Sequence, residues 1–233
     1  MEKRVRLVLG RSLTDRYHDR QQAGQLLATK LSSLANRPDV AVLALPRGGV
    51  PLACEIARSL HADLGVFLVC KVGVPGYQEL ALGAIASGGV TIIDPDIAEE
   101  FRLMPSEVES LVNAAQQELQ RREAVLQGSR PMPDLEGRTV VLVDDGVATG
   151  SSMRAAVEGA KRLKAARIII AAGVMPLSTS LRLRSEVDEV VCPLTPRDFR
   201  AVGLFYEEFP QLSDDDVRAL LENAWQTGAR KAA

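Results

Sequence analysis

Short apolar runs alternate along the chain with segments in which apolar residues recur at helical spacing. Such runs are typical of strands that are buried on both faces of a sheet. Five runs fit this description: residues 40–45, 64–70, 139–143, 167–174 and 189–192. Because the strands alternate with helices, the pattern predicts an α/β fold with a doubly wound, mainly parallel five-stranded sheet flanked by helices.

The helical spacing predicts five helices. They span residues 19–34, 50–60, 106–126, 151–163 and 213–225. Asp19 and Gln22 are suited to cap the first helix, and Ser106 with Glu109 has the spacing of a capping box. The helix 106–126 serves either internal packing or a subunit contact, and the second role would make the chain a homodimer.

Two segments before the long helix have a turn-forming composition. Residues 71–79 are rich in Gly and Pro, so we expect a loop there. Residues 82–93 place apolar runs on both sides of Ser87, Gly88 and Gly89, which predicts a hairpin.

Composition and charge narrow the function classes. The 233 residues are 46% hydrophobic and 25% charged, and the net charge of −2 gives no reason to expect a nucleic-acid or membrane partner. No apolar run approaches the roughly 18 residues of a membrane span. The three cysteines are odd in number and lack a CxxC spacing, which favours free thiols in a reducing, cytoplasmic setting. His18 and His61 stand alone, which argues against a zinc site.

Three unusual segments each follow a predicted strand directly: residues 46–49, 71–76 and 144–150. In open α/β folds, ligands bind at the edge of the sheet where the carboxyl ends of the strands lie. We therefore expect all three segments to meet at that edge.

The third of these segments has the chemistry of a sugar-phosphate site. Asp144 and Asp145 would lie near solvent, where adjacent carboxylates repel each other and need a cation or donors such as the hydroxyls of a ribose. The glycine-bounded loop that follows opens a helix near Ser151, whose unpaired N–H groups and dipole favour an anion. The loop is not a P-loop, because the lysine of that motif is missing.

The stretch VVLVDDGVATGSS, residues 140–152, resembles the signature of type I phosphoribosyltransferases, which bind phosphoribosyl pyrophosphate (PRPP). LPRGGVPLA, residues 45–53, resembles the pyrophosphate loop of that family, and KVGVPGYQELALGAIA, residues 71–86, resembles its lid. The resemblance implies the type I phosphoribosyltransferase fold with a flexible lid hairpin, an inserted helical segment and a small C-terminal hood. One domain would span residues 1–233, with its core at about 19–192, the inserted helix at about 98–127 and the hood and tail at about 193–225.

The resemblance also implies roles for single residues. Asp144 and Asp145 match the acids that hold the ribose 2- and 3-hydroxyls. The positions that match the 5-phosphate loop are Gly146, Val147, Ala148, Thr149, Gly150 and Ser151. Magnesium is the implied cofactor; it would be carried by PRPP and reach the two acids through water, so we expect no direct protein metal site.

Arg47, Gly48 and Gly49 match the pyrophosphate loop, where members of the family often have a cis non-proline peptide bond. Lys71 matches a basic residue beside pyrophosphate in some members, although it could equally be an exposed lysine at a strand end. The implied reaction transfers the 5-phosphoribosyl group of PRPP to a nitrogenous base and releases pyrophosphate. Arg47 and Lys71 would be the catalytic cations that neutralise the leaving group, while closure of residues 72–80 would exclude water.

Acceptor recognition is the least defined part of this interpretation. Aromatic residues cluster in residues 193–209, and the resemblance makes this segment the acceptor hood, with Phe199 and Tyr206 as candidates for contact with an unidentified base. The same aromatics could instead seat the C-terminal tail on the core. An alternative function is a PRPP- or nucleotide-sensing regulatory protein that keeps the pocket without catalysis. A sensor that binds nucleic acid would show a basic stripe or a helix-turn-helix, and the sequence shows neither.

Overall fold

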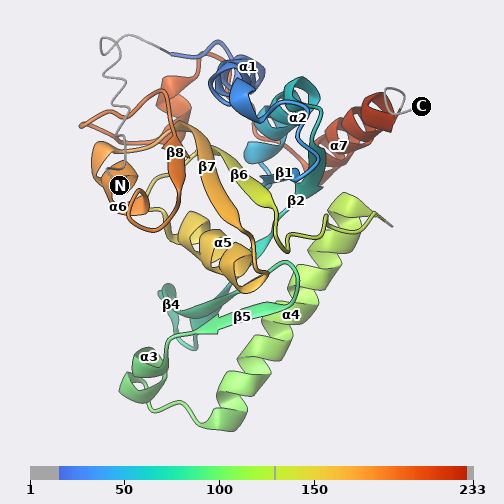
Figure 1. Cartoon of the computed structure of the whole chain (residues 1–233). Coiled ribbons are helices and arrows are strands. Elements are labelled where there is room, and N and C mark those ends of the chain that lie inside the picture. The colour runs from blue at the N-terminus through green and yellow to red at the C-terminus, as the bar shows by residue number, and fades with distance from the viewer. Residues whose placement is uncertain (1–15, 129, 230–233) are drawn as a thin grey trace, which may run out of the picture.

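The computed structural model describes residues 16–128 and 130–229. Its centre is a five-stranded parallel sheet in the order β2-β1-β6-β7-β8 (Figure 1). The strands are β1 (Val40–Ala44), β2 (Asp63–Val66), β6 (Thr139–Gly146), β7 (Arg167–Val174) and β8 (Glu189–Val191). The predicted doubly wound fold is confirmed, because helices cover both faces of this sheet.

Alternate residues of the central strands enter two separate cores. Val42 of β1 packs with α1, α2 and α7, whereas Leu43 packs on the opposite face with α5 and α6. These helices are α1 (Arg20–Lys30), α2 (Gly49–Leu60), α5 (Ser151–Arg162), α6 (Leu177–Leu183) and α7 (Asp214–Ala229). Both faces of the strands are therefore apolar, which is why their sequences read as continuous apolar runs.

The first helix is capped as predicted but is shorter than predicted. Oδ1 of Asp19 accepts the backbone N–H of Gln22 at 2.7 Å, and α1 ends at Lys30. A 3₁₀ turn, η1 (Ser32–Leu34), completes the predicted segment. Three further elements were not predicted, because each is too short to show helical periodicity: α3 (Pro95–Glu100), α6 and η2 (Val202–Phe205).

The chain between β2 and α3 forms a second sheet of three antiparallel strands. They are β3 (Val69–Val74), β4 (Tyr77–Ala86) and β5 (Val90–Ile93). The single strand predicted at residues 64–70 is wrong, because the chain leaves the main sheet after Val66 and enters the small sheet at Val69. The hairpin predicted at residues 82–93 is confirmed as the β4–β5 pair.

The loop predicted at residues 71–79 is also wrong. Val72 and Val74 are buried while their neighbours are less so, which is the alternation of a strand with one covered face. The turn is confined to Pro75 and Gly76, and Gly76 has a φ of +80° that favours glycine. The Gly and Pro content of this segment therefore marks one tight turn between two strands.

The inserted helix α4 (Pro105–Gln127) is the long helix at the lower right of Figure 1. It packs against the three-stranded sheet, β2 and α7, so its packing role is confirmed and a subunit contact stays a prediction. The capping box predicted at Ser106 and Glu109 is wrong. The helix begins one residue earlier, and Oε2 of Glu107 accepts the backbone N–H of Met104 at 2.7 Å. None of the described helices is both long and apolar enough to cross a bilayer.

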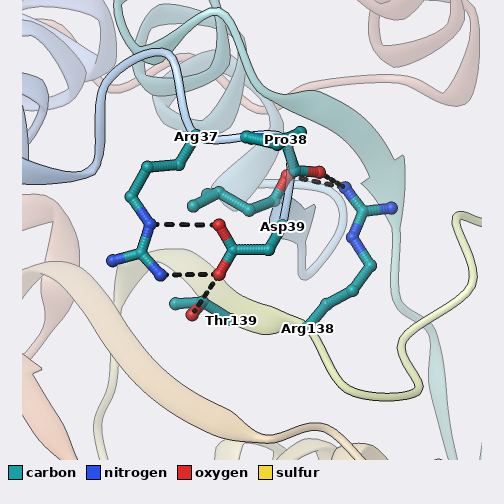
Figure 2. A network of polar contacts seen from close by, with 6 residues as sticks. Arg37, Pro38, Asp39, Arg138 and Thr139 are labelled. Atoms are coloured by element: carbon teal, nitrogen blue, oxygen red, sulfur yellow. Dashed lines mark hydrogen bonds and ion pairs between the residues drawn. The ribbon is translucent and has the colours of Figure 1, made fainter.

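The amino ends of the central strands are tied together by charged side chains (Figure 2). Nε and Nη2 of Arg37 donate to the two carboxylate oxygens of Asp39 at 3.0 and 2.6 Å. Nη2 of Arg138 donates to the carbonyl of Val40 at 2.8 Å and to Oδ2 of Asp63 at 2.8 Å. We call Arg37, Pro38, Asp39, Asp63, Arg138 and Thr139 the N-terminal edge cluster. This cluster holds the starts of β1, β2 and β6 in register.

Candidate active site

The two acids of the signature end strand β6 in different surroundings. The side chain of Asp145 is 11% exposed, and its Oδ2 accepts a hydrogen bond of 2.8 Å from Nε of Arg20, the first residue of α1. Asp144 is half-buried, and its Oδ1 accepts the backbone N–H of Asp145 at 2.9 Å. The expectation that both acids lie near solvent is therefore wrong for Asp145, because Arg20 supplies the cation that adjacent carboxylates require.

The acid pair is electrostatically unequal. Burial, followed by the charge of Asp145, holds the pKa of Asp144 well above its usual range, and the cation of Arg20 opposes this shift only in part. A ligand that brings hydrogen-bond donors or a cation to Asp144 would favour its charged form.

The turn at residues 46–49 lies directly against these acids. The peptide bond before Arg47 is cis, as the resemblance implies. A Cβ on Gly48 would lie 2.1 Å from Oδ2 of Asp145, and a Cβ on Gly49 would meet the backbone of β6. Both glycines are therefore required by close approach, and two of the three segments expected at this edge do meet there.

Arg47 extends from this turn to the start of α7. Its Nη1 donates to the carbonyl of Leu212 at 2.6 Å, and its Nε lies 3.6 Å from Oδ1 of Asp214. The side chain is 43% exposed, so the guanidinium can exchange these partners for a bound anion.

The loop after β6 presents unpaired backbone donors. In the described part of the chain, the N–H groups of Ala148, Thr149 and Gly150 donate to no other group. Ser151 begins α5, and its Oγ lies 3.2 Å from Oγ1 of Thr149. Free N–H groups at the start of a twelve-residue helix form an anion site.

Helix α6 fixes this loop from behind. Oγ1 of Thr179 donates to the carbonyl of Ala148 at 2.9 Å, and Nη2 of Arg182 donates to the carbonyl of Thr149 at 2.7 Å. The loop carbonyls are thus engaged on one side, which leaves the N–H groups for a ligand on the other.

The hood reaches the acids through Tyr206. Its hydroxyl donates to the carbonyl of Asp145 at 2.7 Å, and its ring is buried between the rings of Tyr17 and Phe209. Tyr206 therefore supports the end of β6, while Phe199 stacks on Phe205 with ring centres 5.8 Å apart. The role of Phe199 and Tyr206 in acceptor contact stays a prediction.

A cavity of about 260 Å³ joins these parts of the site. Its lining residues are Arg20, Arg47, Gly48, Asp145, Phe209, Gln211 and Leu212. The pyrophosphate loop, the second acid and the hood thus share one pocket at the carboxyl edge of the sheet.

Comparison with known proteins agrees with this arrangement. A family model described as the phosphoribosyl transferase domain matches residues 14–207. The chain belongs to the phosphoribosyl transferase family. A protein of Mycobacterium tuberculosis, whose name places it provisionally among phosphoribosyl transferases, is 41% identical over 217 residues in each of two strains. The match covers 93% of this chain and 49% of that protein, so the chain spans about half the length of these curated relatives.

A solved structure supports the fold over most of the chain. The crystal structure of TT1426 from Thermus thermophilus is 41% identical, with a TM-score of 0.78. The match covers 89% of this chain and 98% of the Thermus chain.

Lys71 does not line the cavity. It lies in β3, opposite Ala84 of β4, because the chain has already left the main sheet. The expectation that residues 71–76 lie at the edge of the main sheet is therefore wrong, and a catalytic role of Lys71 stays a prediction that requires movement of the hairpin.

The donor set fits a substrate-carried magnesium better than a protein-held one. Within the described residues, no group of three or more His, Cys, Asp or Glu side chains could hold a metal ion. Asp144 and Asp145 offer the oxygen ligands that Mg²⁺ prefers, but Arg20 already neutralises Asp145. Phosphate oxygens of a ligand would have to complete the coordination shell.

Sequence reasoning missed Arg20 as a residue of this candidate site and gave Phe209 no individual role. The acids did indicate that a cation was needed, but no local spacing identifies a partner 125 residues away. Phe209 was recognised only as part of an aromatic cluster, and its place in the cavity depends on the path of the hood.

Proposed function

We propose that this phosphoribosyltransferase binds PRPP with Mg²⁺ and transfers its 5-phosphoribosyl group to a nitrogenous base, releasing pyrophosphate. The observation that carries the proposal is the row of unpaired N–H groups at residues 148–150, shortly after two adjacent acids, of which Asp145 lines a cavity. The loop suits the 5-phosphate, and the acids suit the ribose diol. The cytoplasm is the proposed compartment, since the free thiols suit a reducing setting.

Arg47 is the proposed partner of the pyrophosphate. The bond from the anomeric carbon to pyrophosphate breaks while a nitrogen of the acceptor forms the new bond, so positive charge develops on the sugar and negative charge on the leaving group. Arg47 would give up the carbonyl of Leu212 and Asp214 for that anion. Mg²⁺ carried by PRPP would supply further neutralisation, and Asp144 and Asp145 are the residues that would hold it, through water.

The hood is the proposed acceptor site. Phe209 is the aromatic residue that lines the cavity, and its side of the pocket can hold the face of a planar base. Phe199 and Tyr206 would shape this wall from behind. Lys71 would act only after the β3–β4 hairpin moves toward the cavity.

Isothermal titration of PRPP with and without Mg²⁺ tests the binding step, and a screen of bases for pyrophosphate release tests the reaction. Heat of binding that depends on Mg²⁺, followed by pyrophosphate release with one class of base, is the expected result. Binding without turnover for any base would favour the nucleotide-sensing alternative. An absence of binding in both conditions would overturn the proposal.

A further inference from the structure

Arg20 lies outside every motif that carries the family resemblance, yet it is buried at the centre of the site. It is the first residue of α1, and its side chain is 10% exposed. It lines the cavity together with Arg47 and Asp145. A buried cation in this place requires a reason beyond packing, since burying a charge opposes folding unless it is fully paired.

The guanidinium of Arg20 holds two walls of the cavity at once. Nε donates to Oδ2 of Asp145 at 2.8 Å, and Nη1 donates to the carbonyl of Pro210 at 2.8 Å. Its Cζ also lies 3.7 Å from the centre of the Phe209 ring. Only a planar fork makes these contacts together, because a lysine ammonium is a compact point charge.

Asp145 is consequently fixed from two directions. Arg20 holds its carboxylate, and the hydroxyl of Tyr206 holds its backbone carbonyl. Oδ2 accepts the hydrogen bond of Arg20, and the carboxylate also interacts with the neighbouring carboxyl group of Asp144. The side chain of Asp145 lines the cavity, where a ligand can reach it.

We propose that Arg20 is a positioning residue of the PRPP site, which aims the carboxylate of Asp145 at a ribose hydroxyl and holds the hood segment at Phe209 and Pro210 over the same cavity. This inference rests on the proposed function. Without the cation, the carboxylates of Asp144 and Asp145 repel each other and turn apart, so the diol loses its partner.

The test is the PRPP affinity of Arg20→Gln and Arg20→Lys, measured by titration calorimetry in the presence of Mg²⁺. We expect Arg20→Gln to bind PRPP about 30-fold more weakly, because a charge-assisted contact is lost. Arg20→Lys should lose about fivefold, since it keeps the charge without the fork. Inorganic pyrophosphate should lose less affinity than PRPP in both variants, because its proposed partner is Arg47 and it carries no ribose diol for Asp145.

A double variant separates positioning from a general structural effect. If Arg20 acts through Asp145, then Arg20→Gln combined with Asp145→Asn binds PRPP no more weakly than Asp145→Asn alone. The double variant removes both charges of a buried pair, so it should fold at least as well as Asp145→Asn. The matched control is Arg138→Gln in the N-terminal edge cluster, which should lower thermal stability and leave PRPP affinity unchanged.

The outcomes are distinguishable. If the wild type binds PRPP and both Arg20→Lys and Arg20→Gln bind it with the wild-type affinity, the role of Arg20 is overturned while the proposed function stands. Additive losses of affinity in the double variant would have the same consequence. If Arg20→Gln does not fold, the comparison of Arg20→Lys with the wild type decides, and equal affinity contradicts the proposal. An absence of PRPP binding by the wild type would overturn the proposed function and this inference together.

Discussion

Each end of the central sheet carries an ion pair between an arginine and an aspartate, but one pair is exposed to solvent and the other is buried. At the amino edge, Arg37 and Asp39 form an ion pair in which both side chains are 42% exposed. At the carboxyl edge, Arg20 and Asp145 form a pair whose side chains are 10% and 11% exposed. The first pair lies within one turn before β1, whereas the second joins segments 125 residues apart beside a cavity.

The comparison distinguishes charged side chains that hold strands together from charged side chains that border the candidate ligand cavity. Arg138 at the amino edge donates hydrogen bonds to backbone carbonyls (Figure 2) and to Asp63, so it satisfies groups of the sheet itself. Arg20 and Asp145 instead border a cavity, and the loop beside them has unpaired N–H groups. A buried ion pair is weak evidence for stability, and its position at the ligand-binding edge is better evidence for function.

The largest effect is expected for Asp145→Asn. The variant should bind PRPP about 100-fold more weakly, because the ribose loses a charged partner and Arg20 loses its own. It should also lose about 3 kcal/mol of the free energy of unfolding, since the cation stays buried without a counter-charge. Calorimetric titration and chemical denaturation measure the two losses. Wild-type affinity in this variant would show that the carboxyl edge is no more functional than the amino edge.

Arg47→Ala should have a smaller effect that falls mainly on the reaction. Its exposed side chain contributes little to the fold, so the melting temperature should stay close to that of the wild type. The rate of pyrophosphate release should fall about 100-fold, while the affinity for ribose 5-phosphate changes less. Equal losses of rate and of ribose 5-phosphate affinity would argue against pyrophosphate as the partner of Arg47.

The sequence was sufficient to predict four of the five strands of the main sheet and the two loops at its carboxyl edge. Val42 and Leu43 face different cores, so the strand has no polar positions and is easily recognised. The acids and the glycines of residues 46–49 and 144–150 lie close together in sequence, so their spacing alone indicates their chemistry. Arg20 could not be found in this way, because its distance from Asp145 is fixed only by how α1 packs on the sheet.

The small sheet shows the opposite limit of sequence reasoning. Gly76 and Pro75 are strong turn signals, and they concealed the buried alternation of Val72 and Val74 in β3. The resemblance placed a hairpin only at residues 82–93, and composition indicated a loop at residues 71–79. Tertiary packing on α4 decided in favour of strand β3.

Asp144→Asn should change how stability depends on pH. Because the pKa of Asp144 is raised in the folded chain, its contribution to stability is fully present below the usual carboxyl pKa of about 4 and is lost as pH rises through the raised value. The variant cannot ionise at this position, so its melting temperature should rise relative to that of the wild type as pH increases. Its affinity for PRPP should be about tenfold lower. Parallel melting curves across pH would contradict the electrostatic description of the pair.

Asp39→Asn should give the smallest effect and the opposite sign. The hydrogen bond from Arg37 lowers the pKa of Asp39, so its contribution is present above the usual carboxyl pKa and is lost as pH falls through the lowered value. The melting temperature of the variant should therefore be slightly below that of the wild type at neutral pH and equal to it in strong acid. Added salt should reduce the difference at neutral pH, because both side chains are exposed to solvent. Melting temperatures at low and high ionic strength measure this, with PRPP affinity as the second readout. A loss of PRPP affinity in Asp39→Asn would mean that the two edges are coupled through β1 and β6, and the division between structural and ligand-facing charges would then fail.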